Sequence, residues 1–183
     1  HGLLSSPVGE LMLEGAPVII ADLHSSLPAI LAGTRAADAS EDMRAVYVMT
    51  DGGALPLPYS RTAAALRETG QLAGTVTAGQ AWGGDVEAVS VHNALLAARH
   101  VLGADLIVLI QGPGNLGTDT PWGFSGVACG DAVNAVAALG GRAVACLRIS
   151  QADARSRHQG VSHHSLTAYG KVALAAADVV VPQ

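Results

Sequence analysis

The sequence predicts a doubly wound α/β fold, a Rossmann-like three-layer sandwich with helices on both faces of a mostly parallel sheet of about five or six strands. Along the chain a short apolar run, a polar or glycine-rich turn and a stretch of helical period follow one another repeatedly. The apolar runs are continuous rather than alternating, as in strands buried on both faces. Half of the residues are hydrophobic and only 3% are aromatic, so small aliphatic side chains must fill the core.

Six apolar runs are expected to form strands. The run at 106–110 is the strongest and is expected near the centre of the sheet, because a continuous apolar run needs cover on both faces. The other expected strands are at 18–21, 45–49, 73–77, 143–147 and 179–181.

Five stretches of helical period follow these strands. They are at 27–37, 60–69, 86–102, 126–139 and 165–176. Pro28 suits the first turn of the first helix, and Asp85 stands where the N-cap of the third helix is expected.

Length, charge and cysteine usage limit the functional class. A chain of 183 residues fits one domain, expected over residues 17–183 after an irregular segment at 1–16. The net charge of −5 and the thin spread of Lys and Arg argue against nucleic acid as a partner. The apolar runs are too short to cross a bilayer and no signal peptide opens the chain, so no membrane partner and a cytoplasmic location are expected. Cys129 and Cys146 lack metal-binding spacing and are expected to be buried free thiols.

Polar residues and glycines gather where the expected strands end. In a parallel sheet these ends meet at one edge, where ligands bind. Asp51 and Asp85 are therefore candidate catalytic carboxylates, although a turn carboxylate and a helix cap are the simpler interpretations. The candidate substrate-binding residues at this edge are His24, Gly52, Gly53, Gly83, Gly84, Gly112, Gly114, Gly117 and Thr118.

The loop from Gly112 to Gly117 has the spacing GxGxxG of a dinucleotide-binding turn. Pro121 and Gly123 prevent a helix from starting directly after it, and no acidic residue ends the next strand. A nicotinamide or flavin cofactor is therefore not predicted, and no other cofactor is identified. The loop fits either an anion cradle of backbone N–H groups or a tight structural turn.

Residues 148–169, RISQADARSRHQGVSHHSLTAY, hold the densest ionisable chemistry in the chain. Arg148 ends an expected buried strand and needs an anion or a carboxylate, and Arg157 is expected to share the anion. His158 and His163 are candidate acid/base residues, since imidazole titrates near neutral pH. His163 and the adjacent His164 are not expected to point the same way, and no zinc motif matches the spacing.

Four motifs, VYVMTDGGALP, GGDVEAV, the glycine loop before GFSGV, and RIS with RHQGVSHHSLTAYG, resemble in the same order the bacterial family called domain of unknown function 3866. The resemblance covers nearly the whole chain from about Pro17. It implies that this chain is the carboxyl-terminal domain of a longer bacterial protein. It implies no activity and no cofactor.

An enzyme that binds a small anionic metabolite is the leading expectation, with hydrolysis or group transfer favoured over redox chemistry. A ligand-sensing domain without chemistry remains open. So does a metal-dependent hydrolase in which His24, Asp51, Asp85 and a late histidine bind the ion. The high apolar content favours a homodimer.

Overall fold

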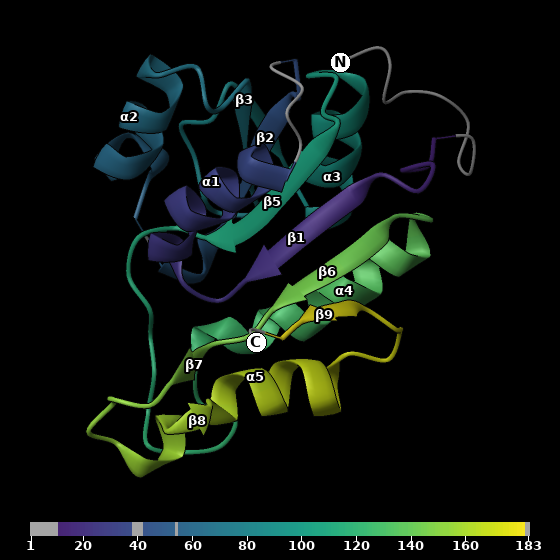
Figure 1. The fold of residues 1–183 in the computed structure, drawn as a ribbon. Helices are drawn as coiled ribbons and strands as arrows, with labels where there is room; N and C mark the ends of the chain where they lie inside the picture. The colour runs from purple at the N-terminus through teal and green to yellow at the C-terminus, as the bar shows by residue number, and fades with distance from the viewer. Residues whose placement is uncertain (1–10, 38–41, 54, 182–183) are drawn as a thin grey trace.

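The computed structural model describes residues 11–37, 42–53 and 55–181. Within these ranges the chain forms a parallel sheet of seven strands in the order β4-β3-β2-β5-β1-β6-β9 (Figure 1). The strands are β1 (Pro17–Ala21), β2 (Ala45–Thr50), β3 (Gly74–Ala78), β4 (Val86–Ala88), β5 (Leu106–Gln111), β6 (Arg142–Cys146) and β9 (Asp178–Val180). The predicted fold class is confirmed, with slightly more strands than expected. Of the irregular segment expected at 1–16, residues 1–10 lie outside the described residues, and 11–16 contain no helix or strand.

The strand predicted to be central is central. All six residues of β5 are buried, and β5 pairs in parallel with both β2 and β1. Ile107, for example, is in register with Val18 on one side and Val46 on the other. Side chains on both faces of β5 therefore lie in the core, which explains its unbroken apolar sequence.

Two helices cover each face of the sheet. Helices α1 (Leu27–Ala37) and α2 (Arg61–Glu68) pack on one face through Leu27, Leu31 and Leu66. Helices α3 (Val91–His100) and α4 (Ala128–Ala138) pack on the other face, largely through small residues. The short last helical segment consists of α5 (His163–Thr167) and one π-helical turn, Ala168–Val172.

Short 3-10 turns and one hairpin complete the described chain. The 3-10 turns are His24–Ser26, Asp51–Gly53, Leu57–Tyr59, Ser125–Val127 and Ser156–His158. The hairpin consists of β7 (Ile149–Ser150) and β8 (Gly160–Val161), which pair antiparallel apart from the main sheet.

The predicted helix at 86–102 is wrong at its start. Residues 86–88 form β4, the edge strand paired with β3, and the helix begins only at Val91. Ser90, whose Oγ accepts a hydrogen bond from Asn93 N at 3.2 Å, caps that helix. Asp85 is therefore not a helix cap. The predicted last helix at 165–176 is also corrected, since it begins at His163 and ends in the π-helical turn.

The sheet has its switch point between β1 and β5. β1 leads to α1 on one face and β5 leads to α4 on the other, so the exits of two neighbouring strands diverge. Figure 1 shows two long excursions beyond the carboxyl end of the sheet, one after β5 and one after β6. No helix within the described ranges is long and apolar enough to span a membrane.

Candidate functional site

A polar pocket of about 570 Å³ lies between the excursions that follow β5 and β6. Most of its lining side chains are charged or can form hydrogen bonds. They come from the exit of β1, from the excursion after β5 and from residues 148–164, and they are Leu23, Asn115, Gly117, Thr118, Asp119, Arg148, Arg155, Arg157, His158 and His164. We call this the polar pocket.

The β7–β8 hairpin brings the arginines and histidines of residues 148–164 to one place. Ser162 N donates a hydrogen bond to Arg148 O at 2.8 Å, so the two ends of the hairpin are held together. Gly160 has φ +67°, a backbone conformation that L side chains rarely adopt. A residue with a side chain at this position would strain the turn that leads into the histidines.

Three arginines give the polar pocket a positive wall. Arg148 Nη2 lies 3.3 Å from Asp153 Oδ2, and Arg155 binds the same carboxylate through two hydrogen bonds of 2.9 Å. Arg157 forms an ion pair with Asp119. Two carboxylates therefore pair with three guanidinium groups, which leaves one positive charge on this wall to attract an anion.

The rings of His158, His163 and His164 form a cluster beside this wall. Their centroids lie 5.1 Å apart for His158 and His163, 4.9 Å for His158 and His164, and 4.5 Å for His163 and His164. One ring nitrogen from each lies within 4.8 Å of those of the other two. We call this group the histidine cluster.

The polar pocket is lined by His158 and His164 but not by His163, in agreement with the expectation that the adjacent histidines do not point the same way. His163 is the first residue of α5, and both rings contact Phe124, edge-on for His163 and stacked at 3.9 Å and 1° for His164. Successive helical residues are rotated by roughly 100°. The two imidazole rings are nevertheless neighbours, with centroids 4.5 Å apart.

Burial favours the neutral forms of His158 and His163. Burial, with the positive charges of Arg148 and Arg155 nearby, lowers the pKa of His158 to about 4. Burial also lowers the pKa of His163, with His164 and Arg157 adding to the effect. Neutral imidazoles keep a lone pair for a proton or for a metal ion.

Asp22, which directly follows β1, lies against the cluster. Its Oδ2 is 3.5 Å from His164 Nδ1, and both side chains are buried. This carboxylate was not among the predicted site residues. The signal in the sequence is a carboxylate at the end of an unbroken apolar strand, VIIAD, and it lies against the histidine cluster because β1 is placed between β5 and β6.

The glycine loop after β5 divides into two parts. Gly117 and Thr118, two of the candidate substrate-binding residues, line the polar pocket. Gly112 and Gly114 instead lie against the exit of β2. A Cβ on Gly53 would collide with the carbonyl oxygens of Pro113 and Gly112, and a Cβ on Gly52 would collide with Gln111. These glycines therefore allow close packing of two strand exits.

Asp51, His24 and Asp85 are not brought into the polar pocket. Asp51 Oδ2 accepts a hydrogen bond from Gln80 N at 3.1 Å. His24 bridges Tyr47 OH at 3.0 Å and Ser60 Oγ at 2.7 Å, and burial lowers its pKa. The four-residue metal site of His24, Asp51, Asp85 and a late histidine is thus not assembled.

Asp85 lies at the start of β4, beside the amino-terminal part of β3. Its carboxylate accepts two hydrogen bonds from Arg67 Nη1, at 2.6 and 2.7 Å, and two from Thr75, at 2.8 Å from N and 2.9 Å from Oγ1. The neighbouring Gly83 has φ +93°, and a Cβ there would lie 2.5 Å from Pro58 Cδ. A Cβ on Gly84 would lie 2.8 Å from Thr77 N. The structure gives all three residues a packing role far from the histidines.

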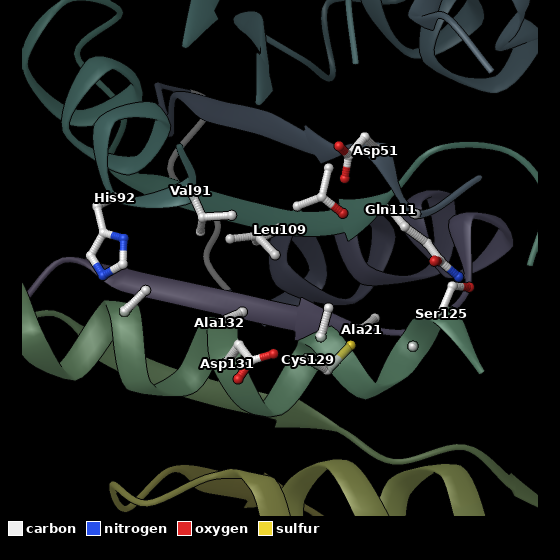
Figure 2. A pocket seen from close by; sticks show the side chains of 15 residues that line it. Ala21, Asp51, Val91, His92, Leu109, Gln111, Ser125, Cys129, Asp131 and Ala132 are labelled. Atoms are coloured by element: carbon white, nitrogen blue, oxygen red, sulfur yellow. The ribbon is translucent and has the colours of Figure 1, made fainter. Parts of the chain in front are cut away.

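A second, mostly apolar cavity of about 350 Å³ lies between α3 and α4, under the end of β5 (Figure 2). Asp51 and Gln111 stand at one end, and His92 at the other. Cys129 of α4 is a buried free thiol that lines this cavity, and burial raises the pKa of its thiol to about 12. Cys146 is also free but only partly buried, so the expected burial holds fully for Cys129 alone.

The family model for proteins of unknown function DUF3866 matches residues 8–183. The chain belongs to this family. The resemblance seen in the four motifs is thereby confirmed at the level of the family. Searches of curated proteins and of solved structures found no match.

Proposed function

We propose that this DUF3866 chain is an enzyme that binds a small phosphate- or carboxylate-bearing metabolite in the polar pocket and carries out hydrolysis or group transfer at the histidine cluster. The observation that supports this is a pocket lined by three arginines, His158 and His164, with His163 beside them in the histidine cluster. Ligands of open α/β sheets bind at this edge. A structural array of charges would not require an open pocket of this size.

The arginines are assigned to the anion. Arg157 and Arg148 each keep guanidinium N–H groups beyond those that pair with Asp119 and Asp153, and planar guanidinium groups bind phosphate or carboxylate in a bidentate manner. Gly117 and Thr118 also line the pocket. Fixing the anion here would hold the rest of the metabolite beside the histidines, which is the positioning part of catalysis.

The histidines are assigned to the reacting bond. In a hydrolysis, the oxygen of a water molecule bonds to the substrate's phosphorus or acyl carbon while a neutral imidazole takes the water's proton. The bond from that phosphorus or carbon to the leaving group then breaks, and the imidazolium returns the proton to the leaving group. His163 is better suited to take that proton than His158, whose pKa of about 4 makes it a weak base at neutral pH. His158 is then assigned no proton transfer, and its neutral ring is held in place by the hydrogen bond to Ser162.

The experiment is a screen of phosphorylated and carboxylated metabolites with product detection by NMR. Purified wild-type protein is expected to turn over one chemical class, and His163→Ala is expected to lose that turnover while still melting more stably in added phosphate. Turnover that survives in His163→Ala, or the absence of any stabilisation by anions, would contradict the proposal.

The proposal includes a cytoplasmic location in a bacterium and a place as the carboxyl-terminal domain of a longer protein. The location is supported by Cys129 and Cys146, two thiols that are free in the described chain, as is usual in a reducing compartment.

A further inference from the structure

We infer that His158, His163 and His164 bind one divalent transition-metal ion of the zinc class, with the Asp22 carboxylate beside them. The inference rests on the proposed function, because it assigns the ion to the same reacting centre, and it changes one role there: with the ion bound, His163 would be a ligand rather than the base, and the ion would activate the attacking water. Its first support is geometric, since one ring nitrogen from each histidine lies within 4.8 Å of the other two. Small side-chain rotations would close such a group around one ion, whose bonds to imidazole nitrogen are about 2.0–2.1 Å.

The second support is the way His158 is held. Its Nδ1 forms a hydrogen bond of 2.7 Å with Ser162 Oγ, and both residues are buried. Ser162 Oγ also accepts a hydrogen bond from His164 N at 3.2 Å. Histidine ligands in proteins commonly use one nitrogen for the metal and the other for an oxygen atom that fixes the ring. Ser162 therefore orients the ring of His158 and leaves Nε2 for an ion.

The third support is a set of buried polar atoms that no described residue satisfies. They are Asp22 Oδ2, His163 Nε2 and His164 Nδ1. Buried polar groups in folded proteins nearly always have a partner, so these three atoms in and beside the histidine cluster need an explanation. A divalent cation held by the three histidines would take up imidazole lone pairs and balance the charge of the nearby Asp22 carboxylate, whereas one hydrogen bond between Asp22 and His164 would leave His163 Nε2 without a partner.

The surroundings resemble those of a catalytic rather than a structural metal. Phe124 stacks on His164 and closes one side of the cluster. His158 and His164 also line the polar pocket, so the other side opens toward the arginines. Catalytic zinc keeps a position for water or substrate, and an ion here would lower the pKa of such a water and polarise the anion. Imidazole donors favour zinc and its transition-metal neighbours over magnesium or calcium.

The test uses the full chain without an affinity tag, stripped of metal. Zinc binding by calorimetry and the visible absorption of bound cobalt are expected to show one ion per chain. His163→Ala is expected to weaken binding by about 100-fold or more, beyond the 10- to 100-fold effect of losing an orienting group. The matched control is His92→Ala on the exposed start of α3, which should bind as wild type does.

A measurement on wild-type protein keeps the inference testable if His163→Ala does not fold. The chain has seven histidines. Histidine side-chain NMR spectra with and without zinc should change strongly at His158, His163 and His164 and little at the other four. No binding by wild type, binding retained by folded His163→Ala, or changes centred on other histidines would overturn the inference.

Phosphate binding to the metal-free protein separates this inference from the proposed function. If phosphate binds and zinc does not, the metal site is wrong and the anion pocket stands. If zinc binds to the three histidines and phosphate binds neither the metal-free nor the zinc-loaded protein, the metal site stands and the anion pocket is wrong.

Discussion

His164 Nδ1 lies 3.5 Å from Asp22 Oδ2, which joins the exit of β1 to the start of α5. Both residues are buried, each with 8% of its surface exposed. Gln111 Nε2 donates a hydrogen bond of 2.8 Å to the backbone oxygen of Asp22, so β5 also fixes this position. The exits of β1 and β5 thus meet at Asp22, and the histidine cluster lies against its carboxylate.

The first prediction concerns this carboxylate. Asp22→Asn keeps the shape of the side chain but removes its negative charge, so we expect zinc affinity to fall roughly 10- to 100-fold, as when a group around a metal site is changed. The backbone hydrogen bond from Gln111 is unaffected, and the fold should persist. Calorimetry measures the affinity and circular dichroism checks the fold. Unchanged zinc affinity in a folded variant would remove Asp22 from the site.

The second prediction separates an anion-binding Arg148 from one that only binds Asp153. Arg148→Lys keeps the charge but loses the planar guanidinium group, so we expect phosphate affinity to fall about 10- to 100-fold, the effect of losing about 1.5–3 kcal/mol of charged hydrogen bonding. The measurement is the rise of melting temperature with added phosphate.

The matched control for Arg148→Lys is Arg142→Lys. Arg142 also pairs with an aspartate, Asp178, but it lies at the exposed start of β6. The Arg142→Lys variant should bind phosphate as wild type does. An Arg148→Lys protein that melts at a lower temperature without phosphate, yet gains as much from phosphate as wild type, would show that Arg148 serves only its bond to Asp153.

The third prediction is a pH dependence of stability in metal-free protein. The pKa of His158 is about 4 in the folded chain and near 6.5 when unfolded, so the unfolded state binds the proton more readily between these values. The contribution of neutral His158 to the free energy of unfolding should therefore be complete above pH 6.5 and should decrease as the pH falls toward 4. The lowered pKa values of His163 and His24 act in the same direction.

Urea unfolding of wild type and His158→Gln at pH 7, 6 and 5 measures this dependence. His158→Gln should show a smaller loss of stability over this range, whatever its stability at pH 7. His92→Gln, with its exposed ring at the start of α3, is the control and should lose as much as wild type. Equal losses in wild type and His158→Gln would show that His158 titrates normally.

The fourth prediction distinguishes the two thiols. Burial raises the pKa of Cys129 to about 12, and it raises the pKa of Cys146 as well, although Cys146 is only partly buried. The thiolate is the reacting species, so a thiol reagent without denaturant should modify Cys146 first and Cys129 slowly. Mass spectrometry of the peptides after timed labelling gives the order. Faster modification of Cys129 would mean that the reagent readily reaches the apolar cavity that Cys129 lines.

Strands buried on both faces were predictable because they depend on local composition. The apolar run at 106–110 contains enough information to place β5 in the centre, and Pro28 helps to mark the start of α1. Edge strand β4 was not predictable in this way. Residues 86–88 precede a helix and have its period, and only pairing with β3 makes them extended.

The histidine cluster depended on tertiary structure. The sequence puts three histidines in one segment, but only the hairpin and Phe124, which comes from the excursion after β5, bring their rings together. Asp22 joins them because β5 and β6 flank β1, an order that no local pattern encodes. The same order separates Asp51 from Arg148, although both follow strands at one edge of the sheet.

The last prediction tests whether Asp85 is structural. Burial raises the pKa of its carboxyl group, but hydrogen bonds from Arg67 and Thr75 outweigh burial and lower the pKa overall. Asp85→Asn removes the charge that Arg67 binds, and we expect a loss of roughly 1.5–3 kcal/mol in the free energy of unfolding. At about 2–4 °C per kcal/mol for a chain of this size, the melting temperature should fall by several degrees. Phosphate and zinc affinities should remain those of wild type, because the Arg67–Asp85 pair lies on the far side of β3 from the histidines. The melting temperature and both affinities are measured on the same preparation. A folded Asp85→Asn protein with unchanged melting temperature and reduced phosphate affinity would show that Asp85 serves ligand binding rather than stability.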